Sequence, residues 1–281
     1  MPFALSVFLF WNPLSALARL VMSDDRYTHI ALVPIMSAIL LYAKRREVFA
    51  QIAPRPKAGF ALLAASGGVY AAASQLLAPG NRLSLQIALL ILVWVSLFLT
   101  LYGNRALRLA TFPFGFLALM VPFPEAVLNG IVTFLQRASA DVSAVLFRLF
   151  GIPYFREGFR FLLPGVEIQV ASECSGVRSA FGLFLSSILA GHLLLRHYSS
   201  RVIFSLAAIP IAIFKNGVRI VSLSYLGVYV NPAFLHGDLH HRYGGLVFST
   251  LSLFLLMILL LVLQRWEVAA ARPAAAVKPQ S

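Results

Sequence analysis

Apolar runs separated by short polar connections dominate the chain and set the expected fold. A helix needs about 20 mostly apolar residues to cross a hydrocarbon core about 30 Å thick. The runs therefore predict about eight membrane-spanning helices, at 3–22, 29–43, 59–78, 84–101, 110–121, 174–195, 202–228 and 244–263. Trp11, Asn12 and Pro13 interrupt the first run, which leaves open whether that span is continuous, broken or re-entrant.

Residues 122–173 do not follow this pattern. From 125 to 150, polar and apolar side chains are interleaved at helical spacing, which predicts an amphipathic helix. Strict alternation then predicts two short strands, 155–161 and 166–170, around the turn residues Pro164 and Gly165. The expected fold is an all-α polytopic membrane protein with an amphipathic helix and a short β-hairpin before the sixth span.

Composition agrees with a membrane protein. Of the 281 residues, 60% are hydrophobic and 12% are charged, which excludes a soluble domain. A net charge of +13 would fit a nucleic-acid partner in a soluble protein, whereas in a membrane protein Lys and Arg gather in cytoplasmic loops. We therefore expect the lipid bilayer, and no nucleic acid, as a partner. Nothing in the sequence indicates an oligomeric state.

The basic residues also predict an orientation. If the connection 44–57 is cytoplasmic, alternation places Arg105 and the basic C-terminal segment on the same side. The insert 122–173 then faces the periplasmic side. The sequence thus predicts one membrane domain over 1–264 and, because residues 265–281 are rich in Ala and Pro, a disordered cytoplasmic tail.

The single cysteine, Cys174, lies where a polar segment gives way to an apolar run. This pattern predicts a helix start with Cys174 in the first turn, where free N–H groups and the helix dipole favour a thiolate. Arg178, four residues on, adds a positive charge on the same face. The alternative is a buried, inert thiol.

Two cations and an amide share one face of the seventh span. Lys215 and Arg219 are four residues apart, and Asn216 precedes Arg219 by three. Charges inside a span are costly and usually mark a functional polar cavity, which we favour here. The alternative is that Arg219 reaches the interface or pairs structurally with Glu173 or Asp238.

The connection after the seventh span holds three of the six histidines: His236, His240 and His241. Histidine is the usual proton shuttle near neutral pH, so a Cys–His pair is favoured. The same residues with Asp238 would also suit a metal ion. We expect no metal and no cofactor.

These motifs together resemble the exosortase/archaeosortase family of membrane-embedded cysteine transpeptidases. The resemblance is carried by the ordered blocks 23–34, 120–124, 135–139, 156–158, 173–178 and 216–219, and by His240 with Gly244 and Phe248. It covers most of residues 20–260.

The resemblance implies a catalytic set of Cys174, Arg219 and His240. His240 is chosen because only it has Gly four and Phe eight residues later, although His236 or His241 could assist or replace it. The family attacks a peptide carbonyl with the thiolate to form a thioester, on substrates with a Pro-Glu-Pro sorting signal at the C-terminus. The resemblance also implies the bacterial inner membrane, with the site facing the periplasm.

We expect Arg178, Lys215 and Asn216 to bind substrate, with Arg178 or Lys215 receiving the Glu of the signal because both are cations near the thiol. Two other classes remain open, a transporter and a non-catalytic export or assembly component. A transporter would need a polar pathway with cations that continues toward mid-membrane, and an assembly component would tolerate loss of the thiol.

Overall fold

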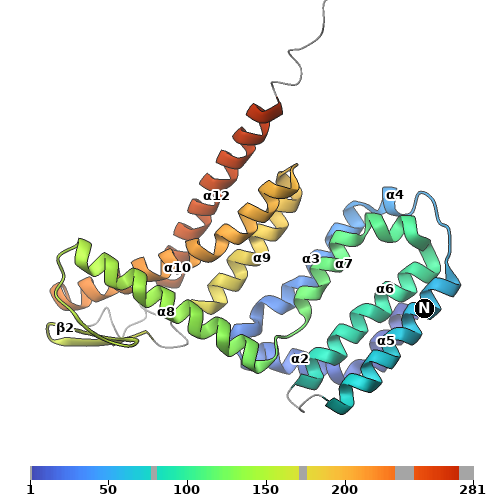
Figure 1. Ribbon diagram of the computed structural model, residues 1–281, viewed down its shortest axis with the longest axis horizontal. Helices are drawn as coiled ribbons and strands as arrows, with labels where there is room; N and C mark the ends of the chain where they lie inside the picture. The colour runs from blue at the N-terminus through green and yellow to red at the C-terminus, as the bar shows by residue number, and fades with distance from the viewer. Residues whose placement is uncertain (1, 77–80, 171–175, 232–243, 272–281) are drawn as a thin grey trace, which may run out of the picture. The chain divides into compact units, whose positions relative to one another are not determined.

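The computed structural model describes residues 2–76, 81–170, 176–231 and 244–271 (Figure 1). These residues are mostly helical, with one small sheet, and they form two compact units, Met1–Asn129 and Gly130–Ser281. Each unit has its own buried hydrophobic cluster, so the units are described separately.

The first unit is built of helices packed around α6. Its elements are α1 (Pro2–Leu9), α2 (Trp11–Ser23), η1 (Asp25–Ala31), α3 (Leu32–Ala43), α4 (Arg45–Val48), α5 (Pro56–Leu76), α6 (Arg82–Leu109), α7 (Thr111–Leu117) and η3 (Ala118–Met120). The α1–α2 pair is bent by 67°, which confirms that the first apolar run is interrupted. The core of this unit is an aromatic cluster around Phe98, with Phe49, Tyr102 and Phe114 packed against it.

The element α6 runs to Leu109 but is broken at Gly103, close to the predicted end of this span at 101. Arg105 and Arg108 lie beyond the break, in a short helical segment. Most residues from 104 to 109 are good helix formers, which explains why this segment is helical. Gly103 bends the helix, because its φ of 83° is non-helical. Any Cβ at this position would lie 1.8 Å from the Ala53 carbonyl oxygen, so only glycine fits.

The second unit combines a small sheet with long helices. The helix α8 (Glu125–Leu149) begins in the first unit and supplies most of its length here, and it is followed by β1 (Phe155–Glu157), β2 (Arg160–Leu163), β3 (Val166–Gln169), α9 (Val177–Leu194), α10 (Tyr198–Tyr229) and α12 (Gly244–Ala271). The amphipathic helix predicted over 125–150 is confirmed. Its buried residues recur every three or four positions, including Leu128, Val132, Leu135 and Phe147.

The sheet has three strands rather than two. The strand order is β1-β2-β3, and both strand pairs are antiparallel. Phe161 of β2 is paired with Arg156 of β1 and with Ile168 of β3. The predicted strand over 155–161 is therefore wrong, because Gly158, with φ of 59°, turns the chain in its middle. The predicted turn at Pro164 and Gly165 is confirmed. Phe147 of α8 packs on Phe161, with ring centroids 5.3 Å apart, and this contact holds the sheet against the helix.

The helices α9, α10 and α12 share a second apolar core. It contains Leu183, Phe204, Ala208, Leu256 and Leu260. The turn between α9 and α10 is held by Glu267 of α12, whose carboxylate accepts hydrogen bonds from the backbone N–H groups of Arg196 (3.0 Å) and His197 (2.9 Å). The helix α12 extends to Ala271, so residues 265–271 are helical and the prediction of disorder is wrong for them. Residues 272–281 lie outside the described part of the chain.

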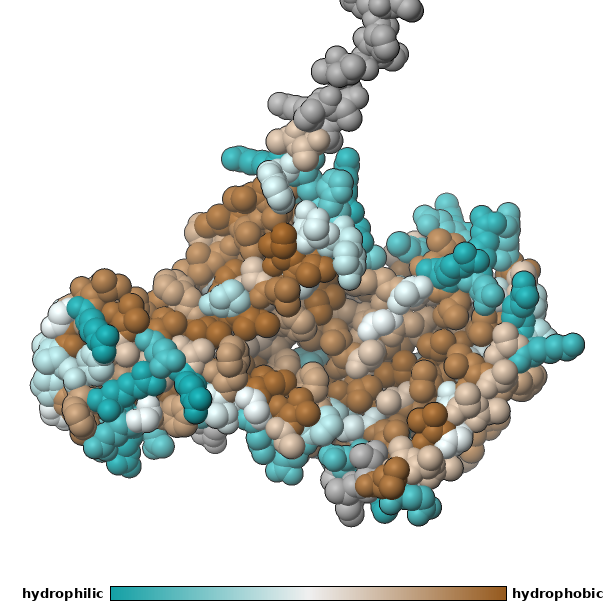
Figure 2. All heavy atoms as spheres, viewed as in Figure 1, coloured by the Kyte–Doolittle hydropathy of each residue, from teal (hydrophilic) through white to brown (hydrophobic). Residues whose placement is uncertain are grey.

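Several helices are suited to crossing a membrane. Within the described residues, five are long and apolar enough, and seven if each bent pair is counted as one span. The eight predicted spans are not confirmed. The helix α5 is not among these candidates, and the span predicted at 110–121 qualifies only together with α8, across a bend of 88°. Figure 2 shows mostly hydrophobic residues over the exposed faces of the helices, with hydrophilic residues gathered over the β-strands and α4. Large apolar side chains such as Phe254 and Met257 of α12 are more than half exposed, as expected for a lipid-facing helix.

Candidate functional site

The N-terminal end of α9 is fixed by a glycine. Gly176 has φ of 72° and ψ of 15°, a left-handed conformation that favours glycine, and Val177 is the first helical residue. The helix therefore begins at Val177, and the start of the sixth span predicted at residue 174 is wrong by three residues. The backbone break at Gly176 is the reason.

This end of α9 packs against α10. A Cβ on Gly176 would lie 3.3 Å from Asn216 Oδ1, so the side chain of Asn216 packs closely against the backbone of Gly176. Lys215 Nζ donates a hydrogen bond of 2.6 Å to Ser179 Oγ, and Ser179 in turn donates to the Gly176 carbonyl oxygen at 2.9 Å. A chain of hydrogen bonds thus runs from a cation of α10 to the residue that starts α9.

Lys215 and Asn216 are buried at this contact, with exposed fractions of 3% and 1%. Within the described residues, no carboxylate pairs with Lys215, and neither side-chain atom of Asn216 has a hydrogen-bond partner. An unpaired buried amide costs about 1–3 kcal/mol, so native proteins retain one mainly where it has a role. Among the described residues, the amide of Asn216 therefore leaves its hydrogen-bonding capacity unused beside the start of α9.

Arg178 and Arg219 flank this pair. Arg178 is the second residue of α9 and is exposed, whereas Arg219 is half-buried on α10, one helical turn beyond Lys215. Both arginines have interaction partners. The prediction that the start of the sixth span and the end of the seventh lie together is thus confirmed for the described residues Gly176 to Ser179 and Lys215 to Asn216.

A third element packs behind the site. Gly217 faces α8 so closely that a Cβ there would lie 2.6 Å from Val142 Cγ1. The helix α8 also reaches the chain that precedes the site, because Gln136 Nε2 donates to the Val170 carbonyl oxygen. The backbone N–H of Val170 donates to the Phe159 carbonyl oxygen at 2.9 Å. Val170, the last described residue before 171–175, is therefore anchored to both the helix and the sheet.

Several predicted residues lie outside the described part of the chain. These are Cys174 and Glu173 in 171–175, and His236, Asp238, His240 and His241 in 232–243. The predicted meeting of Cys174 with Arg219 and His240, and the alternative metal site, therefore stay predictions. Among the described residues, no group of three or more His, Cys, Asp or Glu could hold a metal ion.

Two residues of the site were not predicted. Ser179 directly follows the block 173–178, and its spacing of three from Gly176 is the signal for a side chain that bonds back to the helix start. Gln136 lies on the amphipathic helix, where the sequence does not distinguish it from the other polar residues. No sequence signal identifies its partner, Val170, which is 34 residues away.

The fold and this buried polar contact define a multi-pass helical membrane protein with ionisable groups placed inside its spans. The family model for the transmembrane exosortases (Exosortase_EpsH) matches residues 21–261. The chain belongs to this transmembrane exosortase family. Comparison with curated proteins and comparison with solved structures each found no match.

Proposed function

We propose that this protein is a membrane-embedded cysteine peptidase or transpeptidase that cleaves the C-terminal sorting signal of exported proteins. The observation that carries the proposal is the contact of Lys215 and Asn216 with the N-terminal end of α9, two residues beyond Cys174. Buried polar groups in membrane helices commonly mark a functional site. Membership of the exosortase family supports the same class of activity.

In the proposed reaction, the thiolate of Cys174 attacks the carbonyl carbon of the scissile peptide bond. Arg219 stabilises the negative oxygen of the tetrahedral intermediate, because a fixed donor is most effective where water is excluded. The carbon–nitrogen bond then breaks, and His240 donates a proton to the leaving amine. The product is a thioester on Cys174.

The second half of the reaction releases the substrate. His240, now neutral, takes a proton from an incoming amine or water, which attacks the thioester carbon. The carbon–sulfur bond breaks and the thiolate of Cys174 is restored. Transfer and hydrolysis differ only in the nucleophile. This scheme uses no metal and no cofactor.

The proposed substrate carries a signal of the Pro-Glu-Pro type. Arg178 or Lys215 receives the Glu carboxylate, since both cations lie at the N-terminal end of α9 or against it. Asn216 binds the peptide backbone. Its amide has no partner among the described residues, so both its donor and its acceptor are available for a peptide group.

The proposed location is the bacterial inner membrane, with the site facing the periplasm. The basic residues of 44–57 support this orientation, because Lys and Arg gather on the cytoplasmic side. The site and this basic connection then face opposite sides of the membrane. The proposed partners are the sorting-signal segment and the lipid bilayer, and nucleic acid is not a partner.

The decisive test is loss of the thiol. Cys174→Ala, co-expressed with a substrate that carries the signal, should leave the substrate uncleaved while the variant accumulates in the membrane like the native protein. Cys174 in the native protein should form a substrate adduct that hydroxylamine releases, as expected for a thioester. Ser186→Ala, which removes an exposed hydroxyl on α9, is the control. Normal cleavage by Cys174→Ala would favour a transporter or an assembly component.

A further inference from the structure

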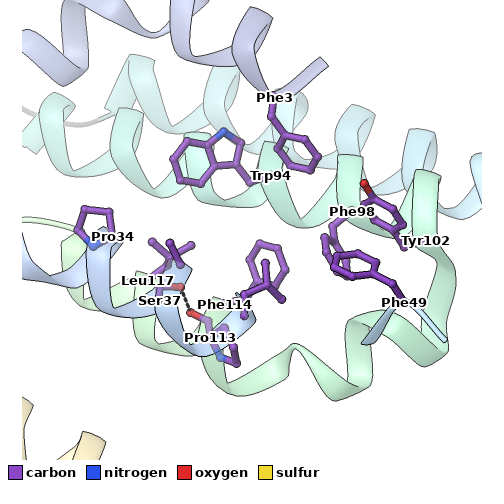
Figure 3. Close-up of a pocket in the computed structure, with 12 residues that line it drawn as sticks. Phe3, Pro34, Ser37, Phe49, Trp94, Phe98, Tyr102, Pro113, Phe114 and Leu117 are labelled. Atoms are coloured by element: carbon purple, nitrogen blue, oxygen red, sulfur yellow. Dashed lines mark hydrogen bonds between the residues drawn. The ribbon is translucent and has the colours of Figure 1, made fainter. Parts of the chain in front are cut away.

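The first unit contains a cavity of about 400 Å³ that the proposed peptidase site does not use. It lies between α6 on one side and α3 and α7 on the other, and Phe3 of α1 points into it (Figure 3). Its walls are almost entirely apolar, and they include Leu41, Phe49, Trp94, Phe98, Phe114 and Leu117. This volume is within the range of about 300–1,000 Å³ that is typical of ligand pockets.

Two polar groups on the cavity wall, those of Ser37 and Trp94, are already paired. Ser37 Oγ donates to the Pro113 carbonyl oxygen at 2.7 Å, a bond drawn in Figure 3. Trp94 Nε1 donates to Ser6 Oγ at 2.9 Å. The cavity therefore offers contacts to hydrocarbon rather than hydrogen bonds, and it would suit an apolar chain.

One end of the cavity is strongly basic. Phe49 and Tyr102 line this end, and the chain beside them is held by hydrogen bonds from Arg105 to Gln51 and from the Ala53 N–H to the Tyr102 carbonyl oxygen. Five cations lie in or beside α4 and at the end of α6. Lys44 directly precedes α4, Arg45 and Arg46 are its first residues, and Arg105 and Arg108 lie at the end of α6. Glu47 is the one acidic residue in the described stretches 44–57 and 103–109, so the surface here carries a clear positive excess.

We propose that this cavity binds an anionic phospholipid, with one acyl chain between α6 and α3–α7 and the phosphate headgroup at Arg46 and Arg105. The apolar wall fits the acyl chain, and the basic end fits the negative headgroup. A substrate helix is a poorer occupant, because a helix with its side chains is about 10–12 Å wide and would need α6 and α3 to separate. The inference is independent of the proposed peptidase activity.

Trp94 makes the proposal testable by fluorescence quenching. The chain has three tryptophans, so Trp11→Phe with Trp266→Phe leaves Trp94 as the single emitter. This variant is placed in vesicles containing phosphatidylglycerol or phosphatidylcholine, each brominated on the acyl chain and at equal mole fraction. Brominated phosphatidylglycerol should quench Trp94 about twofold or more strongly than brominated phosphatidylcholine. A matched variant that keeps only Trp266, an exposed residue, should be quenched equally by both lipids.

Two further variants identify the parts of the site. Arg46→Gln with Arg105→Gln should abolish the preference of Trp94 for the anionic lipid, so that both lipids quench about equally, whereas Arg82→Gln with Arg148→Gln removes the same charge elsewhere and should leave the preference intact. Ala38→Phe, which fills the cavity, should reduce quenching by both lipids. With both arginines present, equal quenching of Trp94 by the two lipids would overturn the proposal, and so would an unchanged preference after loss of Arg46 and Arg105.

Discussion

Lys215 and Ser179 form a hydrogen bond of 2.6 Å that joins α10 to the first turn of α9, and the lysine is 3% exposed. Among the described residues, the hydroxyl of Ser179 is the partner found for this ammonium group. A buried charge with one neutral partner contributes little to folding, since the cost of removing it from water offsets the bond. The contact is therefore better explained by function than by stability.

Replacing Lys215 should separate stability from function. Lys215→Met keeps the length and the apolar stem of the side chain, so the melting temperature in detergent should be unchanged or higher. Substrate cleavage should fall by about tenfold or more, because a charge-assisted hydrogen bond is lost at the site. Lys57→Met, an exposed lysine of the first unit, is the control and should change neither quantity. A Lys215→Met protein that cleaves normally would remove Lys215 from the site.

Gly217 should tolerate no side chain unless α8 yields. In Gly217→Ala the added Cβ would lie 2.6 Å from Val142 Cγ1, and overpacking of this kind costs about 1–3 kcal/mol. Unfolding by heat should show this loss. The double variant Gly217→Ala with Val142→Ala removes the clashing methyl group and should recover part of the stability. If the double variant loses more free energy of unfolding than the two single variants lose together, the clash is not the cause.

Glu267 should stabilise the turn between α9 and α10. Glu267→Ala leaves the N–H groups of Arg196 and His197 without their acceptor, which should cost about 1–3 kcal/mol and lower the melting temperature. Gln264→Ala removes a more exposed hydrogen bond to the Leu194 carbonyl oxygen in the same region and should have a smaller effect. Equal effects of the two variants would contradict this role.

The pair of Asp24 and Arg26 should make stability depend on acid pH. The side-chain hydrogen bond from Arg26 lowers the pKa of Asp24 below its ordinary value of 3.8. The carboxylate form therefore stabilises the folded state above pH 3.8, and this contribution is lost as the pH falls through the lower, folded-state pKa. Asp24→Asn should remove this part of the pH dependence, as measured by melting between about pH 6 and pH 3. Arg26→Gln should have the same effect as Asp24→Asn, and a different outcome would mean that the two residues do not act as a pair.

Recognition of the signal should depend on charge. If Arg178 or Lys215 receives the Glu of the substrate, changing either residue to Gln should reduce cleavage of the native signal. The native enzyme should cleave a substrate with Gln in place of Glu poorly. The cleavage rate of this substrate should fall little further when the residue that contacts the Glu, Arg178 or Lys215, is also changed to Gln. Initial cleavage rates for the four enzyme–substrate combinations measure this coupling. Equal cleavage of the Glu and Gln substrates by the native enzyme would exclude a charge contact.

The sequence predicts the long helices well because their signal is local. The apolar runs of α9 and α10 and the helical spacing of α8 can be read directly, and the structure confirms these helices. The errors occur where single glycines decide the backbone. Gly158 divides an alternating segment into two strands, Gly103 breaks the helical backbone of α6, and Gly176 moves the start of α9 from the predicted 174 to Val177.

The candidate site is only partly readable for a different reason. Lys215, Asn216 and Arg219 stand out because polar residues are rare in spans. The partners of Lys215 and Gln136 depend on which helices pack together, and Ser179 and Val170 are 36 and 34 residues away in the sequence. Contacts at such separations follow from tertiary packing, which hydrophobic periodicity does not encode.

The anchoring of Val170 has a consequence for how this chain can vary in length. Val170 is held by the sheet and by Gln136, and Gly176 is held by Ser179, so five residues must join two fixed points. Insertions should be tolerated at the β-turns around Gly158 and Gly165, where the backbone reverses at the edge of the sheet. Between Val170 and Gly176, an added or deleted residue would change the number of residues that join the two anchors. The spacing from the sheet to α9 should therefore be the least variable interval in the insert.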